Sequence, residues 1–295
     1  MKKKRIFSLL FTLIMCVFLS NATILPTYAY SETTLAKIKA LDLSKENDIN
    51  QYIKYKDEIH DRYYKLKSSG KFEEAREVLD EIKQIDNYTK ATKVSNQKAS
   101  LENTRSTSNS VNVTWISQVV DNKCGVATAA MILSNHGQSV SINDSTLLQR
   151  LKFNLYNETV WYTIDGMTLD QYPMATTLNT YIGSTSYIPK PYKGIGSTLT
   201  ASNLWSSTVS AVDAGRVFAC DGISYSSGNS HLTNYPATEV HHWLVISGYK
   251  TENGSNYIHV TDPAAGISGF TNVSAKRYEL QAKMYSYASS RGIIY

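Results

Sequence analysis

The sequence predicts an α+β domain over residues 111–295, with helices first and an antiparallel sheet after them, preceded by a charged helical hairpin within residues 30–94. In the larger region, apolar residues recur at helical spacing first, and β-branched and aromatic runs follow, an order typical of α+β domains. Residues 30–110 carry 15 basic and 14 acidic side chains in 81 positions, whereas residues 111–295 carry 11 of each sign in 185 positions. The Ser, Asn and Thr-rich segment 95–110 shows no periodicity, so we interpret it as a linker between the two regions.

The N-terminus has the pattern of an export signal. Four basic residues precede an apolar stretch from Ile6 to Leu19, which is too short to span a bilayer comfortably, and small residues end at Ala29. A lipoprotein signal ending at Cys16 fits less well, because Met15 is bulky where a small residue is preferred. We therefore expect a signal peptide over residues 1–29 and a secreted protein, extracellular or associated with the cell wall.

Charge and cysteine content exclude several classes of protein. Loss of the signal lowers the formal net charge from +5 to 5 − 4 = +1, so no basic surface for nucleic acid is expected. Only Cys124 and Cys220 remain after cleavage, which excludes a framework of disulfides. No further long apolar run is present, so we expect no stable membrane insertion.

The charged region predicts two amphipathic helices, at about 47–67 and 71–89, with Gly70 ending the first. Acidic residues at the start of the second helix favour its positive end. Two interpretations remain open: a solvated helical spacer, and an intramolecular pro-segment that covers a cleft and restrains activity.

The domain's own elements follow from periodicity and turn residues. We expect Asn253-Gly254 to form a turn between the last two strands. The predicted helices and strands are helices at 124–135, 144–155, 168–181 and 201–214, and strands at 216–220, 243–247 and 257–261.

Cys124 is the candidate nucleophile. It opens the helix 124–135, with Asp121 or Asn122 as the expected cap, and the unpaired amides and dipole of a helix start stabilise a thiolate. A thiolate beside an imidazole is what covalent attack on a carbonyl carbon requires. The alternative is a buried cysteine that acts as a small hydrophobic residue.

Gln118 lies six residues before Cys124, on the loop that enters the nucleophile helix. An oxyanion intermediate needs a second donor besides the backbone amide at the nucleophile, and a side-chain amide supplies one. The alternative is an ordinary polar loop residue.

The general base should come from His241 or His242, which point to opposite faces of one strand. Asp262 ends the next strand, where a carboxylate would orient the imidazole. A tight Asn253-Gly254 turn, however, places Asp262 opposite Val245, roughly 10 Å along the strand from His242. We therefore predict a longer loop or a bulge between residues 249 and 257.

Taken together, these motifs resemble the papain-like cysteine peptidases of the bacteriocin-processing, double-glycine leader-peptidase type, over residues 111–295. The matching segments are Gln118, the Cys124-Gly125 helix start, the strand from His242 to Gly248-Tyr249, and Asp262-Pro263. The resemblance implies a papain-like fold in which Cys124 is the nucleophile, His242 the base, Asp262 its partner and Gln118 the oxyanion donor. No transporter region is attached, so leader-peptide specificity is not carried over.

The remaining candidates have structural interpretations. Cys220 lies within a strand and should belong to the core. The other histidines lack the paired Cys or acidic spacing of a metal site, so no metal or cofactor is expected; they are His60, His136, His231 and His259.

The sequence thus predicts a secreted cysteine peptidase that hydrolyses peptide or protein substrates through a Cys124 thioester. Two alternatives remain: a cell-wall peptide hydrolase or acyltransferase that uses the same residues, and a non-catalytic binding module built on the same fold.

Overall fold

A computed structural model describes residues 33–41, 46–88, 107–161, 172–191 and 199–295. The predicted signal peptide, residues 1–29, and most of the predicted linker lie outside these residues. Residues Thr34–Tyr295 form a single compact unit. None of the described helices is long and apolar enough to cross a membrane.

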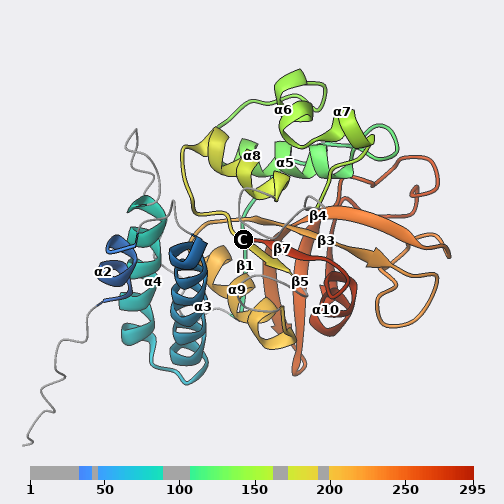
Figure 1. Ribbon diagram of the computed structural model, residues 1–295. Coiled ribbons are helices and arrows are strands. Elements are labelled where there is room, and N and C mark those ends of the chain that lie inside the picture. The colour runs from blue at the N-terminus through green and yellow to red at the C-terminus, as the bar shows by residue number, and fades with distance from the viewer. Residues whose placement is uncertain (1–32, 42–45, 89–106, 162–171, 192–198) are drawn as a thin grey trace, which may run out of the picture. The chain divides into compact units, whose positions relative to one another are not determined.

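The described strands form one seven-stranded sheet in which every pair is antiparallel (Figure 1). Its order is β2-β7-β3-β4-β5-β6, and β1 pairs with β4 beyond the end of β3. The strands are β1 (Ser108–Ser110), β2 (Pro189–Pro191), β3 (Phe218–Ser224), β4 (Val240–Glu252), β5 (Ser255–Thr261), β6 (Lys276–Leu280) and β7 (Gly292–Ile294).

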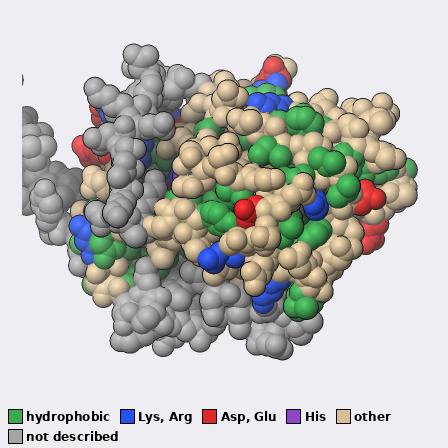
Figure 2. Space-filling model, turned by 90° about the horizontal axis from the view of Figure 1, so that it is seen from above, with side chains coloured by type: hydrophobic (Ala, Val, Ile, Leu, Met, Phe, Trp, Pro, Cys, Tyr) green, Lys and Arg blue, Asp and Glu red, His purple; other side chains and the backbone are tan. Residues whose placement is uncertain are grey.

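Helices lie on both sides of the sheet. In Figure 1, α5, α6, α7 and α8 gather above it, and α9 and α10 lie below it. The described helices are α2 (Thr34–Lys39), α3 (Glu46–Ser68), α4 (Phe72–Tyr88), α5 (Cys124–Asn135), α6 (Ser145–Arg150), α7 (Phe153–Tyr156), α8 (Pro173–Ile182), α9 (Ala201–Asp213) and α10 (Gln281–Ala288). The face seen from above carries only isolated charged side chains (Figure 2), consistent with the low charge density of residues 111–295.

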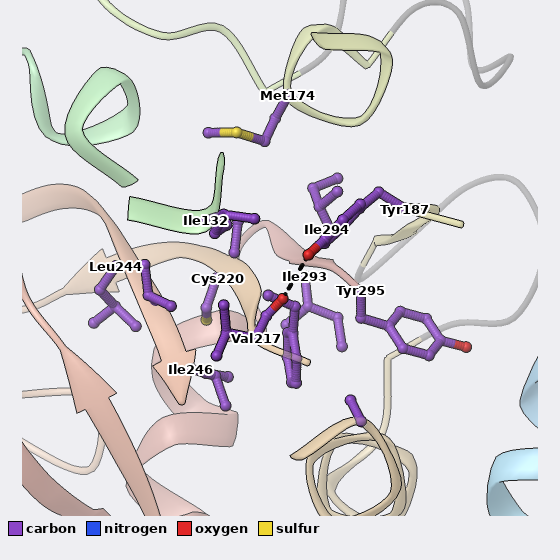
Figure 3. Close-up of a cluster of buried hydrophobic side chains, with 14 of the residues drawn as sticks. Ile132, Met174, Tyr187, Val217, Cys220, Leu244, Ile246, Ile293, Ile294 and Tyr295 are labelled. Carbon is purple, nitrogen blue, oxygen red and sulfur yellow. Dashed lines mark hydrogen bonds between the residues drawn. The ribbon is translucent and has the colours of Figure 1, made fainter. Parts of the chain in front are cut away.

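The core joins the helices to the sheet. Figure 3 shows Ile132 of α5 between Met174 of α8 and the pair Cys220 and Leu244, which lie opposite each other on β3 and β4. All four side chains are fully buried. Because α5 is apolar along its whole length, it packs as a central helix, which fixes the position of its first residue.

Most predicted elements are present, with shifted boundaries. The helix 124–135 is confirmed, whereas the helix predicted at 144–155 is divided into α6 and α7, because Lys152 adopts a positive φ of 56° between them. Residues 108–110, within the predicted linker, form β1 instead, and Val111 N continues the pairing by donating to Ser247 O.

The predicted Asn253-Gly254 turn joins β4 and β5, but the longer loop or bulge predicted between residues 249 and 257 is absent. Asn253 and Gly254, both with positive φ, form a tight two-residue turn, and Glu252 pairs with Ser255. The bulge lies outside the predicted segment: the pairing shifts by one residue between Ile246 and Gly248. A side chain at Gly248 would lie 2.8 Å from Asn109 O, so the close approach of β1 accompanies this irregularity.

The segment α3–α4 packs on the rest of the unit through buried polar contacts. Helix α3 lies against α9 (Figure 1). Asp86 of α4 pairs with Arg216 at 2.8 Å, and Asp57 of α3 pairs with Lys190 at 2.5 Å. All four charged residues are buried or half-buried, although Asp57 and Asp86 belong to helices whose high charge density favours a solvated surface.

Asp213 at the end of α9 is the centre of one such network. Its carboxylate accepts bonds from Tyr63 (2.5 Å), Lys67 (2.6 Å), Tyr249 (2.7 Å) and Asn109 (2.9 Å). Asp213→Ala leaves these donors without their acceptor, so we expect a loss of about 3 kcal/mol in the free energy of unfolding, measured by urea denaturation.

The matched control removes an exposed carboxylate. Asp80 forms only a 3.8 Å ion pair with Lys83 on the surface of α4, so Asp80→Ala should cost less than about 0.5 kcal/mol. Equal effects of the two substitutions would show that Asp213 does not hold the helices to the domain.

Candidate active site

Cys124 is the first residue of α5, and its side chain is 8% exposed. Lys123 occupies the cap position and provides no side-chain bond to the helix, so the predicted cap at Asp121 or Asn122 is wrong. The chain instead turns at Asn122, where φ is positive, and enters the helix directly. No side-chain cap therefore competes with the Cys124 sulfur at this positive helix end.

His242 and Asp262 are brought together by the bulge in β4. Without it, Asp262 would lie opposite Val245, on the other face of the strand pair from His242. Because the pairing shifts by one residue at the bulge, extending the β4–β5 register past Thr261 places Asp262 opposite Leu244. Leu244 is two residues from His242 on β4, so the His242 and Asp262 side chains point to the same face. At this diagonal position, His242 Nε2 and Asp262 Oδ1 are 2.9 Å apart.

Asp262 is fully buried, and three further groups hold it in place. Oδ2 accepts from Tyr235 Oη at 2.7 Å and from Arg277 Nη1 at 2.8 Å, while Oδ1 also accepts from Ala264 N at 2.9 Å. Burial alone would raise the pKa of this carboxyl, but His242 and Arg277 outweigh burial and hold the pKa well below its usual range. The carboxylate is therefore ionised at all ordinary pH values.

Tyr235 and Arg277 were missed by the sequence analysis. Tyr235 lies in the connection before β4, and Arg277 lies on β6, next to β5 in the sheet. No spacing in the sequence marks either residue, since each reaches Asp262 only after the sheet has formed. Arg277 also donates to Glu279 at 2.7 Å, which fixes the guanidinium.

His242 is buried and interacts with both Asp262 and Cys124. Because Asp262 is bonded at Nε2, the other ring nitrogen, Nδ1, is the one left to interact with the Cys124 sulfur. Burial lowers the pKa of His242, but the Asp262 charge and hydrogen bond, together with Cys124, raise it to about 10. An imidazolium is thus favoured beside the sulfur at neutral pH.

Gln118 lies beside this group. Its backbone N donates to Pro263 O at 3.0 Å, so the loop before α5 is tied to the residue after Asp262. Its side chain is 4% exposed, and Nε2 donates to Val120 O at 3.1 Å. Because an amide nitrogen carries two N–H groups, one donor remains for a ligand.

A pocket of 740 Å³ opens over these residues. Gln118, Cys124 and His242 line it, whereas Asp262 lies behind His242. No residue of the described parts of α2, α3 or α4 belongs to the lining.

Gly125, next to the nucleophile candidate, leaves room for Thr159 in the pocket wall. A Cβ on Gly125 would lie 2.3 Å from Thr159 Cβ. Gly125→Ala should therefore push the loop that carries Thr159 and cost about 1–3 kcal/mol in the free energy of unfolding. Thermal denaturation of the single variant and of Gly125→Ala with Thr159→Gly tests this, since the second change removes the clash. If the double variant does not recover stability beyond the sum of the single changes, the contact is not the cause.

The alternative candidates lie elsewhere. His241 is exposed and pairs with Glu239 at 2.8 Å, so the structure brings only His242 to Asp262. Cys220 is fully buried, and burial raises the pKa of its thiol, in agreement with the predicted core position. Within the described residues, no group of three or more His, Cys, Asp or Glu side chains is arranged to hold a metal ion.

Comparison with known proteins identifies the family of the chain. No curated protein matches the sequence. Residues 110–291, more than half of the chain, match the model of the Peptidase_C39 like family. The matched segment includes the pocket, the helix that begins at Cys124, and the strands that carry His242 and Asp262. The chain therefore belongs to the Peptidase_C39 like family and is a protein of the cysteine peptidase type.

Proposed function

We propose that this protein is a secreted cysteine peptidase of papain-like fold that hydrolyses peptide bonds through a thioester on Cys124. The observation that carries the proposal is the chain of contacts at the pocket floor: Cys124 at a helix start, the His242 ring beside it, and Asp262 2.9 Å from that ring. Secretion rests on the predicted signal in residues 1–29, outside the described residues.

In the acylation step, the Cys124 thiolate attacks the carbonyl carbon of the scissile peptide bond. The oxyanion that forms is held by backbone N–H at the start of α5 and by the free N–H of Gln118. The His242 imidazolium then gives its proton to the leaving amine, so the C–N bond breaks and a thioester remains.

In the deacylation step, neutral His242 takes a proton from water, and the resulting hydroxide attacks the thioester carbonyl. Collapse of this second oxyanion releases the carboxylic acid product and restores the thiolate–imidazolium pair. Asp262 supports both steps, because its carboxylate fixes the ring orientation and stabilises the imidazolium.

Incubation of the purified protein with casein and, separately, with purified cell wall tests this proposal. We expect new peptides from casein, identified by mass spectrometry, and none when Cys124 is replaced by alanine. Release of peptides from the wall alone would support the cell-wall alternative. Absence of products from both substrates would contradict a peptidase function.

A further inference from the structure

Asp221 is a buried carboxyl in the pocket wall to which the proposed mechanism gives no role. It lies on β3 opposite Trp243, one residue before Gly222, which pairs with His242. Asp221 is 6% exposed and is one of the residues that line the pocket. Arg291 acts on its carboxyl electrostatically, but among the described residues no cation forms an ion pair with it.

Burial makes the charge of Asp221 unfavourable in the unoccupied pocket. Burial raises the pKa of this carboxyl to about 8, although Arg291 and His242 both act to lower it. Since the desolvation of this group has already occurred on folding, a cation that entered the pocket would gain an acceptor fixed in place. The entering cation would also favour ionisation of the carboxyl.

The rest of the pocket lining is acidic as well. Asp121, Glu158 and Glu239 surround the opening as exposed carboxylates, and Arg291 is the one Lys or Arg among the described lining residues. Glu239 is paired with His241 at 2.8 Å. The other two exposed carboxylates and Asp221 outnumber the single guanidinium, so this side of the pocket favours a cation over an anion.

Aromatic rings complete this environment. Trp161 and Trp243 lie with ring centroids 5.5 Å apart, and both line the pocket together with Tyr156. Faces of Trp and Tyr attract Lys and Arg side chains, and their apolar surface covers the aliphatic part of such chains. Carboxylates beside aromatic rings thus form a recognition surface for a basic side chain.

We infer that this part of the pocket is a subsite for a Lys or Arg side chain of the peptide substrate, with Asp221 as its specificity-determining residue. The inference rests on the proposed peptidase function and adds the class of substrate. Arg291 repels an incoming cation, so the cation is expected to bind near Asp221, Glu158 and the tryptophans instead.

Cleavage of a peptide library tests the inference. The wild-type protein is incubated with a library that contains all residue types at each position, and mass spectrometry identifies the cleaved bonds. We expect enrichment of Lys or Arg at one position next to the cleaved bond. A charged hydrogen bond of this kind corresponds to roughly ten- to hundred-fold in kcat/KM, measured on a matched Lys and norleucine peptide pair.

Variants then assign the preference to one residue. Asp221→Asn keeps the shape but removes the charge, so it should lower the Lys to norleucine ratio at least about ten-fold while cleavage of the norleucine peptide continues. Asp221→Glu should keep part of the preference. Glu252→Gln, an exposed change outside the pocket lining, should leave the ratio unaltered.

The outcomes separate this inference from the proposed function. Cleavage without enrichment of basic residues, or an unchanged ratio in Asp221→Asn, overturns the subsite and leaves the peptidase intact. Failure of the wild-type protein to cleave any library peptide overturns both. The wild-type cleavage pattern does not depend on the folding of any variant, so the inference stays testable if Asp221→Asn is unstable.

Discussion

Replacement of Cys124 by alanine should lower kcat for peptide hydrolysis by on the order of 10⁴-fold or more, to the level of the buffer control. The covalent route needs a sulfur at the start of α5, and Cys124 is the only cysteine among the described residues that line the pocket. Steady-state hydrolysis of one fluorogenic peptide, with the variant's fold checked by circular dichroism, measures the effect.

The matched control is the second cysteine. Cys220 lies on β3, between β4 and β7, and is fully buried. Cys220→Ala should therefore reduce the free energy of unfolding by about 1–3 kcal/mol through a small cavity, and leave kcat close to the wild-type value. A Cys124→Ala variant that retains more than a few per cent of the activity would mean that the chemistry uses another group.

Asp262→Asn should have the second largest effect, a loss of roughly 10³-fold in kcat/KM near neutral pH together with a changed pH profile. The charge of Asp262 is the largest of the effects that raise the pKa of His242 to about 10 against burial; its hydrogen bond and Cys124 add to it. With a neutral amide this charge is lost and the pKa falls, so the imidazolium is lost at lower pH.

The sign of the pH dependence follows from the raised pKa. In the wild-type protein, the imidazolium is favoured below the unfolded value of 6.5 and is lost as pH rises through about 10, so activity should decline on that alkaline side. In Asp262→Asn, this alkaline limb should move down by more than a pH unit. Rates between about pH 5 and 11 measure the position of this alkaline limb.

His241→Asn is the matched control and should not move the alkaline limb, because His241 is exposed and pairs with Glu239. An unmoved limb in Asp262→Asn would contradict the assigned role.

Local signals in the sequence were sufficient for the nucleophile helix. The apolar and small residues from Cys124 to Asn135 set its limits without any tertiary contact, and the observed helix has the same limits. Strand β4 was also predicted from its local run of apolar and β-branched residues, although it extends further on both sides than the predicted 243–247. The charges of α3 gave no sign that Lys67 would be buried against Asp213 of α9, or that Asp57 would pair with Lys190 of β2.

The sequence identified His242 and Asp262 as partners, but it did not predict the strand register that brings them together. Pairing residues outward from the tight turn placed Asp262 opposite Val245, on the face away from His242. That pairing assumed that the β4–β5 register has no bulge. The bulge near Ser247 arises where β1, more than a hundred residues earlier, packs against Gly248. Arg277 and Asp221 were missed for the same physical reason, since their roles depend on neighbours that only the folded sheet provides.

Mapping of alkylated cysteines is the most direct measurement of the central idea, that a thiolate at the head of α5 is held by the His242 ring. The folded protein is treated with one equivalent of iodoacetamide near neutral pH, digested and examined by mass spectrometry. We expect the label on Cys124 and almost none on Cys220, with a strong reduction in the His242→Ala variant. Equal labelling of the two sulfurs, or labelling of Cys124 that is unchanged without His242, would contradict the account.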